Sequence, residues 1–344
     1  MRTSSVIRVS VVGAAGYSGA EAVRLLARHP RAALAGLFGS PGGKGAAFAD
    51  LHPDLAGLSG PDVVPYAEEG LLAARPDAAI LATPNEVSAS LAPRLLAAGV
   101  RVVDVSGAFR LKDAALYPAW YGFEHPAPAV LAEAVYGLTE WCGAELDGAR
   151  FVANPGCYPT SVLVALKPLA PLLDGARPVL VTSASGVSGA GKKAELAYSF
   201  CEIAGSYKAY AAGTHRHEPE MRQELGLAAD AAFTFVPHLL PLVRGILSTI
   251  HVSFAGEVTD AGLAERYAAA YADRPFVRVH PAGRLPELKE VVGTPRAHVG
   301  WKLLPGGRRA IVVSAIDNLL KGAASQAVQN LNRLFGLPET EWLL

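Results

Sequence analysis

A glycine-rich segment near the start of the chain restricts the possible folds more than any other feature of the sequence. It has the pattern G-x-x-G-x-x-G and spans Gly13–Gly19. The β-branched run Val6–Val12 precedes it, and an Ala/Leu-rich stretch extending to about His29–Pro30 follows it. A buried parallel strand, a glycine turn and a helix in this order are typical of a dinucleotide-binding domain. Glycines let the backbone approach a pyrophosphate, and the helix N-terminus offers it N–H donors. The alternative is a tight turn without a ligand. The predicted cofactor contacts here are Gly13, Ala14, Gly16, Tyr17, Ser18 and Gly19.

The second predicted strand, Ala33–Phe38, indicates which dinucleotide is preferred. An NAD site needs an acidic residue near the end of this strand, whereas a 2′-phosphate favours small polar and cationic groups. No acidic residue follows the strand before Asp50. We therefore predict NADP(H), with Ser40 and Lys44 on the phosphate; a solvated loop lysine is the alternative for Lys44.

Two further strand–helix units repeat this pattern. The strands are Ala78–Ala82 and Arg101–Val105, and the helix between them is Glu86–Ala98. In an open α/β sheet, ligands bind outside the carboxyl ends of the strands. The residues that follow these strands are therefore candidate cofactor contacts, and one arginine is a candidate phosphate ligand, because guanidinium matches phosphate oxygens two at a time. A surface salt bridge is the alternative for that arginine. The candidates are Thr83, Pro84, Ser106, Gly107 and Arg110.

A cysteine lies between an apolar run and the next predicted helix. Asn154–Pro155–Gly156 precedes Cys157, and a helix is predicted to begin near Pro159. The N-terminus of a helix stabilises a thiolate, which is the reactive form of cysteine. Cys157 is therefore the candidate nucleophile, with a small buried apolar role as the alternative.

After Cys157 the strand–helix alternation gives way to an α+β pattern. Pro178–Ser183 is a predicted strand that leads into a polar, glycine-rich loop containing Ser188, Gly189 and Lys193. The loop resembles a hydrolase nucleophile elbow, but Ala190 replaces the last glycine of G-x-S-x-G. We predict that Ser188 and Gly189 contact the cofactor and that Lys193 contacts the substrate.

A pair of histidines follows in Thr214–Glu220. An extended H-x-H segment places both rings on one face. Half a zinc site and a purely structural role are alternatives, but the better assignment is an acid–base partner for the thiolate. His217 is predicted in that role because Glu218 and Glu220 follow it, and His215 and Glu220 are predicted to contact the substrate. No metal is predicted.

The second half carries apolar runs that predict a mixed sheet, and helical spacing near the end predicts a last helix capped by Asp317 or Asn318. We expect this helix to return to the first domain and Asn318 to lie near the nicotinamide. The predicted division is a dinucleotide-binding domain over 1–156, completed by 318–344, and a catalytic and oligomerisation domain over 157–317.

The overall composition excludes several classes of function. The 344 residues hold 31 Lys plus Arg and 31 Asp plus Glu, so no net field attracts nucleic acid or a membrane. Three scattered cysteines argue against a disulfide framework. Residues Met1–Ser5 lack a signal-peptide pattern, and no apolar run reaches the roughly 18 residues of a membrane span. We expect a cytoplasmic protein.

Together these motifs resemble the N-acetyl-gamma-glutamyl-phosphate reductase family of arginine biosynthesis. The resemblance extends over nearly the whole chain and is most specific in Asn154–Thr160 and His215–His217. It implies Cys157 as nucleophile, His217 as its acid–base partner and NADPH as reductant. It also implies a homodimer or homotetramer. Independently of the resemblance, we predict that Arg110 and Asn154 contact the substrate.

The implied chemistry is the reduction of an acyl phosphate. A thiolate displaces inorganic phosphate to give a thioester, and hydride then yields the semialdehyde. One alternative shares most of the motifs: a reductase acting on a carrier-linked aminoadipyl or glutamyl phosphate. A second alternative, aspartate-semialdehyde dehydrogenase, performs the same chemistry on a shorter substrate, but the stretch His215–Glu220 argues against it.

Overall fold

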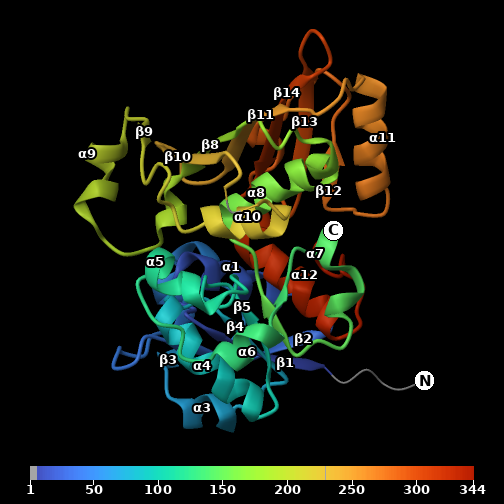
Figure 1. Cartoon of the computed structure of the whole chain (residues 1–344). Coiled ribbons are helices and arrows are strands. Elements are labelled where there is room, and N and C mark those ends of the chain that lie inside the picture. The colour runs from blue at the N-terminus through green and yellow to red at the C-terminus, as the bar shows by residue number, and fades with distance from the viewer. Residues whose placement is uncertain (1–5, 229) are drawn as a thin grey trace. The chain divides into compact units, whose positions relative to one another are not determined.

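The computed structural model describes residues 6–228 and 230–344 (Figure 1). The predicted absence of a signal peptide concerns residues 1–5, which lie outside the described residues. The chain divides into two compact units: unit 1 comprises residues 1–155 and 323–344, and unit 2 comprises residues 156–322. Among the described residues, no helix combines the length and the apolar character needed to cross a membrane.

Unit 1 is built on a parallel sheet with the strand order β3-β2-β1-β4-β5-β7-β6. The chain order reverses beside β1, which places a topological switch point between β1 and β4. This is the predicted doubly wound α/β fold class. The strands are β1 (Ile7–Val12), β2 (Ala32–Gly39), β3 (Val63–Pro65), β4 (Ala78–Leu81), β5 (Arg101–Asp104), β6 (Val135–Tyr136) and β7 (Phe151–Ala153).

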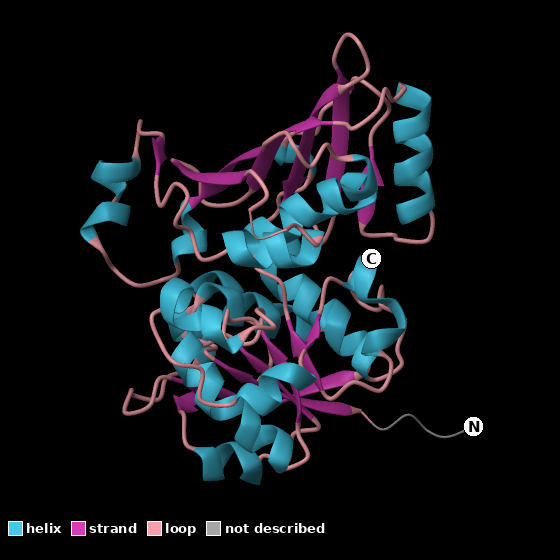
Figure 2. Cartoon of the chain, viewed as in Figure 1, coloured by secondary structure: helices cyan, strands magenta, loops and turns pink. Residues whose placement is uncertain are grey.

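Helices lie against both faces of this sheet (Figure 2). They include the predicted helices after β1 and β4. Helix α1 begins at Tyr17, inside the glycine segment expected to precede it, and α4 begins one residue before the predicted Glu86. The helices of unit 1 are α1 (Tyr17–Leu26), α2 (Phe48–Leu51), α3 (Glu68–Ala73), α4 (Asn85–Ala97), α5 (Tyr117–Tyr121), α6 (Pro128–Glu133), α7 (Thr139–Cys142) and α12 (Ser325–Leu334).

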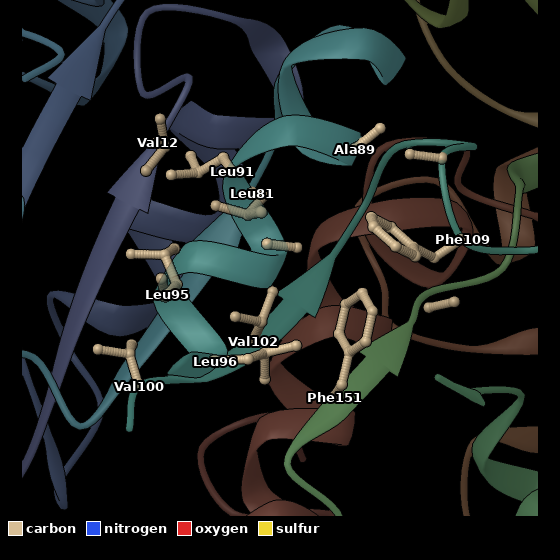
Figure 3. Close-up of a cluster of buried hydrophobic side chains, with 14 of the residues drawn as sticks. Val12, Leu81, Ala89, Leu91, Leu95, Leu96, Val100, Val102, Phe109 and Phe151 are labelled. Carbon is tan, nitrogen blue, oxygen red and sulfur yellow. The ribbon is translucent and has the colours of Figure 1, made fainter. Parts of the chain in front are cut away.

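One hydrophobic cluster of unit 1 lies between α4 and the sheet (Figure 3). The leucines of α4 point toward the strand side chains, and the rings of Phe109 and Phe151 meet edge to face with centroids 4.6 Å apart. Burying each large apolar side chain stabilises the fold by about 1.5–3 kcal/mol. This packing fixes the carboxyl ends of the central strands. The labelled cluster consists of Val12, Leu81, Ala89, Leu91, Leu95, Leu96, Val100, Val102, Phe109 and Phe151.

The C-terminal helix α12 belongs to unit 1, as predicted, and it is held there by buried polar contacts. Asn330 Nδ2 donates to Gly137 O at 2.8 Å and to Asn154 Oδ1 at 3.0 Å. Thr139 Oγ1 donates to Asn330 Oδ1 at 2.8 Å. Asn330, Thr139 and Asn154 are fully buried, so these hydrogen bonds have no competition from water. They tie α12 to the segment that ends at Asn154.

Unit 2 contains a mixed sheet with the strand order β12-β13-β14-β11-β8-β10-β9. Residues alternate between buried and exposed along β8, β10 and β11, as expected for a sheet with one covered face. The strands are β8 (Val179–Gly186), β9 (Lys208–Ala209), β10 (Phe233–Leu240), β11 (Ile246–Ser253), β12 (Val277–Val279), β13 (Ala297–Leu303) and β14 (Arg309–Ile316). The helices are α8 (Cys157–Leu166), α9 (Phe200–Ile203), α10 (Glu218–Leu225) and α11 (Asp260–Tyr271).

A chain of buried serine hydroxyls fixes α8 on this sheet. Ser161 Oγ lies 2.8 Å from Ser248 Oγ on β11 and 2.7 Å from Ser314 Oγ on β14. Ser248 Oγ also lies 2.7 Å from Ser183 Oγ on β8. Ser314 Oγ donates to the Ser161 carbonyl at 2.6 Å. Ser161 is one helical turn beyond Cys157, so the hydroxyl chain limits rotation of α8 under the cysteine.

Two predicted helix starts need correction. Helix α8 begins at Cys157 rather than near Pro159, because Gly156 is extended and acts as the N-cap. Pro159 fits inside the first turn, where its missing N–H has no intrahelical acceptor. The last helix is preceded by a π-helical turn, Leu320–Ala324. Asp317, one of the two predicted caps, caps this π-helical turn and not α12, whose N-cap is Ala324. The N–H groups of Leu319 and Leu320 donate to Asp317 Oδ1 at 2.8 and 3.1 Å.

Asn330→Ala is expected to destabilise unit 1. The substitution leaves the Gly137 carbonyl and the Asn154 amide without their buried partner, and each such group costs about 1–3 kcal/mol. Chemical denaturation should show a lower free energy of unfolding. The control is Arg28→Ala at an exposed position after α1, which should change it by less than about 0.5 kcal/mol. Equal stability of the two variants would contradict this account of α12.

Candidate cofactor and active sites

The glycine turn between β1 and α1 is held at the carboxyl ends of the neighbouring strands. Gly13 has φ +92°, and a Cβ there would lie 2.2 Å from the Ala82 carbonyl oxygen. The N–H groups of Gly13 and Ala14 donate to Phe38 O on β2 at 2.8 and 3.1 Å. Only glycine satisfies both the backbone conformation and the close approach at position 13.

A buried histidine supports the same turn from α2 and its following loop. His52 Nε2 donates to the Ala14 carbonyl at 3.1 Å. The sequence gives no periodic or motif signal for this contact, because His52 is distant in sequence and isolated. The first turn of α1 contains no acidic residue, so no carboxylate in that turn neutralises the positive end of the helix dipole. Gly16 is its N-cap, Ser18 is half-buried and Tyr17 is exposed, so the predicted contacts line an anion-accepting helix end.

The segment after β2 exposes the predicted 2′-phosphate ligands. Ser40 and Lys44 are both exposed, and Ser40 O accepts from Gly43 N at 3.1 Å in a tight turn. Ser40 directly follows β2, whose Phe38 carbonyl is bonded to the glycine turn. The structure therefore places Ser40 at the carboxyl end of β2, the strand whose Phe38 carbonyl contacts the glycine turn. The contacts of Ser40 and Lys44 with phosphate stay predictions.

The loops after β4 and β5 are ordered by side-chain hydrogen bonds. Thr83 Oγ1 lies 2.7 Å from Ser88 Oγ, and Pro84 is the N-cap of α4. Gly107 N donates to Asn85 Oδ1 at 2.8 Å, which links the two loops. The predicted contacts Thr83, Pro84 and Gly107 thus lie at adjacent strand ends.

Beneath Gly107, a fully buried carboxyl organises the turn. Asp104 Oδ1 accepts from Ser106 N at 3.0 Å, and Asp104 Oδ2 accepts from Ser106 Oγ at 2.8 Å. Burial raises the pKa of Asp104, while the hydrogen bonds from Ser106 and the charge of Arg110 oppose that shift. Ser106 is therefore engaged in shaping the loop.

Arg110 is buried and joins two strand ends. Its Nε donates to Asn154 O at 2.8 Å and its Nη2 donates to Val105 O at 2.7 Å. Asn154 is fully buried and, through its side chain, contacts Asn330. These contacts give both residues a positioning role at the ends of β5 and β7. Their predicted contacts with substrate stay predictions.

Cys157 occupies the first position of α8 in unit 2, and its side chain is partly exposed. The N–H of Gly156 donates to Glu220 Oε1 at 2.8 Å, so α10 fixes the start of α8. The first turn of α8 contains no acidic residue that would oppose a thiolate. This is the helix position that stabilises negative charge on sulfur. Glu220, predicted to contact substrate, is fully buried at this junction.

The two predicted histidines form one cluster, but their segment is a turn and not the extended strand we expected. His217 N donates to His215 Nδ1 at 3.2 Å, which closes the turn before α10. The ring centroids are 4.8 Å apart. The ring of Tyr158, the residue after Cys157, lies edge-on to both, at 5.4 Å from His215 and 5.9 Å from His217. The cluster therefore lies beside the residue that follows the cysteine.

The surroundings of His215 determine its protonation state. Burial, followed by the charge of Arg216, lowers the pKa of His215 to about 4. His215 is therefore neutral at neutral pH and is unsuited to donate a proton from an imidazolium. Tyr158 and Tyr210 share a hydroxyl hydrogen bond of 2.9 Å. Burial raises the pKa of Tyr210 to about 12 and raises that of Tyr158 as well, so both phenols are neutral.

A close backbone approach further restrains the cysteine. A Cβ on Gly322 would lie 2.8 Å from Cys157 Cβ. Gly322 lies in the π-helical turn, and its N–H donates to Asp317 O at 2.9 Å. Nothing in the sequence pattern identifies Gly322 or the Glu220–Gly156 contact, because both depend on elements far apart in the chain.

The remaining predicted residues of unit 2 lie near the loop after β8. Asn318 Nδ2 donates to Ser188 Oγ at 2.9 Å, and Gly245 N donates to Asn318 Oδ1 at 2.7 Å. Gly189 is adjacent, since a Cβ on it would lie 3.7 Å from Asn318 Nδ2. Lys193 is separate: its side chain is exposed and lies 3.2 Å from Glu195. Ser188, Gly189 and Asn318 thus form one polar cluster, and Lys193 lies outside it.

Two protein families match the chain in two consecutive parts, one in each of the two units. Residues 8–149 match the family described as semialdehyde dehydrogenase, NAD binding domain, and residues 157–318 match semialdehyde dehydrogenase, dimerisation domain. The chain is 44% identical over 340 residues to an N-acetyl-gamma-glutamyl-phosphate reductase of Brevibacillus brevis, covering 97% of each chain. It is 47% identical over 347 residues to one of Halorhodospira halophila, covering 98% of each.

Solved structures share the fold. Aspartate semialdehyde dehydrogenase II of Vibrio cholerae, complexed with ASA, superposes with a TM-score of 0.72 and 20% identity, covering 96% of this chain and 98% of that one. The aspartate semialdehyde dehydrogenase of Candida albicans with NADP has a TM-score of 0.65 and 16% identity, covering 96% and 99%.

Gly322→Ala is expected to disturb Cys157. The added methyl group would lie 2.8 Å from Cys157 Cβ, so either α8 or the π-helical turn must shift. The rate of iodoacetamide alkylation of Cys157, followed on its peptide by mass spectrometry, should change by at least about threefold. Gly175→Ala is the control, because a Cβ there meets no atom within 4 Å. If both variants alkylate at the wild-type rate, the close approach does not position the thiol.

Proposed function

The chain belongs to the N-acetyl-gamma-glutamyl-phosphate reductase family, and we propose that it reduces N-acetyl-gamma-glutamyl phosphate with NADPH. The products are N-acetylglutamate 5-semialdehyde, inorganic phosphate and NADP. The observation that carries the proposal is the match of nearly the whole chain to reductases named for this reaction, at 44–47% identity. The position of Cys157 at the start of α8 supports it independently.

The first step is acyl transfer to Cys157. The thiolate attacks the carbonyl carbon of the acyl phosphate, the carbon–oxygen bond to phosphate breaks, and a thioester forms with release of inorganic phosphate. The N-terminus of α8 favours the thiolate. His217 accepts the thiol proton and returns it to the leaving phosphate oxygen.

The second step reduces the thioester. Bound NADPH supplies the hydride. Addition of hydride to the thioester carbon leaves a thiohemiacetal oxyanion on Cys157, and cleavage of the carbon–sulfur bond then gives the aldehyde and regenerates the thiolate. Backbone N–H groups at the start of α8, with His217, are the candidate donors to this oxyanion.

The proposed cofactor contacts are assigned segment by segment. The glycine turn fits a pyrophosphate, because its backbone is held open by Gly13 and α1 has no acidic residue in its first turn. Ser40 and Lys44 are assigned to the 2′-phosphate. The loops after β4 and β5 and the Asn318 cluster are assigned to the nicotinamide half; their proposed contacts are Thr83, Pro84, Ser106, Gly107, Ser188, Gly189 and Asn318.

The remaining assignments concern the substrate. Arg110 and Lys193 are proposed to contact its phosphate, and Asn154, His215 and Glu220 its acyl portion. The buried position of Asn154 and Glu220 favours an effect through the neighbouring backbone. The neutral His215 suits a hydrogen bond to the amide of the N-acetyl group.

We further propose that the protein acts as a homodimer or homotetramer in the cytoplasm. Unit 2 matches a family described as a dimerisation domain. It exposes large apolar side chains, including Leu180, Leu196, Phe200 and Val243, which a second copy would cover. All three cysteines are free thiols, which suits a reducing compartment.

The reaction is tested in the direction of oxidation. With N-acetylglutamate 5-semialdehyde and NADP, absorbance from NADPH should appear only when phosphate or arsenate is present. Aspartate semialdehyde at the same concentration is the control substrate and should react at least about 100 times more slowly. Phosphate-independent turnover, or a preference for aspartate semialdehyde, would overturn the proposal.

His217→Asn is expected to lower the maximal rate by about 10²–10⁴-fold, the usual contribution of a positioned acid–base group. It should also raise the pH at which Cys157 is alkylated, because the proposed cationic imidazole no longer favours the thiolate. His215→Asn is the matched comparison and should mainly raise the apparent KM. If His215→Asn instead abolished the rate and shifted the alkylation profile, the two roles would be exchanged.

Ser40→Asp is expected to move the cofactor preference from NADPH toward NADH. The new carboxylate would repel a 2′-phosphate and accept hydrogen bonds from ribose hydroxyls. The ratio of kcat/KM for the two cofactors measures the change. Asp50→Asn, in helix α2 after that loop, is the control. Equal use of NADPH and NADH by the wild type would contradict the assignment of Ser40.

A further inference from the structure

Three side chains converge near the edge strand of the unit 2 sheet, and the proposed reaction uses none of them. His280 follows edge strand β12, His298 lies on the adjacent β13, and Glu290 lies in the short helical segment Leu288–Glu290 between them. Both histidines are almost completely buried. His280 Nε2 lies 3.1 Å, and His298 Nδ1 3.3 Å, from the same oxygen, Glu290 Oε2.

The two distances to Glu290 Oε2 are close to the spacing of neighbouring ligands around a small metal ion. Zinc binds imidazole nitrogen and carboxylate oxygen at about 2.0–2.1 Å, so neighbouring ligands of a tetrahedral site are about 3.3 Å apart. One ligand atom from each of the three residues lies within 4.8 Å of the other two. We propose that His280, Glu290 and His298 form a binding site for a divalent transition-metal ion of the zinc class.

The second oxygen of the carboxyl group is already fixed. Arg284 Nη2 donates to Glu290 Oε1 at 2.8 Å, which leaves Oε2 directed to the histidines. Such an outer hydrogen bond commonly orients a ligating carboxylate. Without the ion, each imidazole donates an N–H to Glu290 Oε2; with the ion, each ring carries its proton on the other nitrogen. No redox step is required.

Two of the three proposed ligands border a cavity that leaves room for a further ligand. A cavity of about 580 Å³ is lined by Glu290 and His298, together with Arg278, Arg296 and apolar residues of the β12 region. Three protein ligands with an open fourth position are typical of zinc sites that accept an exogenous ligand. The cavity therefore gives water or an anion access to the ion.

The arginines around the cluster are expected to weaken its affinity for a metal ion and to favour an anion as the fourth ligand. Arg278, Arg284 and Arg296 are exposed, so solvent screens their repulsion of a cation without removing it. Glu290 is the one acidic ligand of the three. We expect micromolar rather than nanomolar binding of zinc and a stabilising effect of an anion such as carboxylate in the fourth position.

The sequence predicts no metal at this position because its ligands do not form a short motif. The spacings are ten residues from His280 to Glu290 and eight from Glu290 to His298. The residues meet only because β12 pairs with β13 in the register Arg278↔His298.

Metal binding is tested on the full chain carrying Cys157→Ser, since a reactive thiol is a good zinc ligand and would compete for the ion. The EDTA-treated protein is titrated with Zn²⁺ against a chromophoric chelator in phosphate-free buffer. One ion per chain is expected. Titration with Co²⁺ should give the visible absorption of a tetrahedral site, a readout that does not depend on activity.

Variants of the ligands locate the ion. His298→Asn and Glu290→Gln, each in the Cys157→Ser chain, should weaken zinc binding by at least about 100-fold. His251→Asn, at an exposed histidine of β11, is the matched control and should bind like its parent. Thermal unfolding of each variant establishes that it is folded. Absence of saturable binding, or equal affinity of His298→Asn and His251→Asn, would overturn the proposal and leave a hydrogen-bonded cluster only.

Discussion

The hydrogen bond from Gly156 N–H to the buried Glu220 side chain is the contact on which the proposed chemistry depends. It joins the starts of two helices, and the residue that follows Gly156 is the cysteine. Further polar contacts hold the rest of α8: the serine chain binds its middle, and the hydroxyls of Tyr267 and Tyr271 donate to the carbonyls of Ala165 and Val164 at its end. A nucleophile on a helix anchored in this way has little freedom to leave its reactive orientation.

Buried polar side chains also hold the loops at the strand ends of unit 1. The carboxyl of Asp104 fixes the turn at Ser106, the guanidinium of Arg110 joins the ends of β5 and β7, and Asn330 ties α12 to the same edge. Burying these groups costs free energy unless their hydrogen bonds are made, so each is strongly coupled to its partners. The strand ends of the sheet are therefore shaped before a ligand binds.

The sequence predicts the elements and many of the candidate residues because these rest on local patterns. The strand–glycine–helix order, the turn capped by Asp317 and the cysteine near a helix start are each determined by neighbours in the chain. The contacts of His52 with Ala14, of Glu220 with Gly156 and of Gly322 with Cys157 join residues at least 38 positions apart. No pattern along the chain encodes them. The turn at His215 was missed for a related reason: alternation suggests a strand, whereas a side-chain acceptor, His215 Nδ1, closes a turn.

The central claim is that Cys157 carries the acyl group during the reaction, and the covalent intermediate tests it most directly. The enzyme is mixed with N-acetyl-gamma-glutamyl phosphate in the absence of NADPH, quenched in acid and digested for mass spectrometry. The account predicts an N-acetylglutamyl thioester on the peptide containing Cys157, formed at least as fast as steady-state turnover and discharged on addition of NADPH. An unmodified Cys157 in enzyme that turns over normally, or an acyl group on another residue, would contradict it.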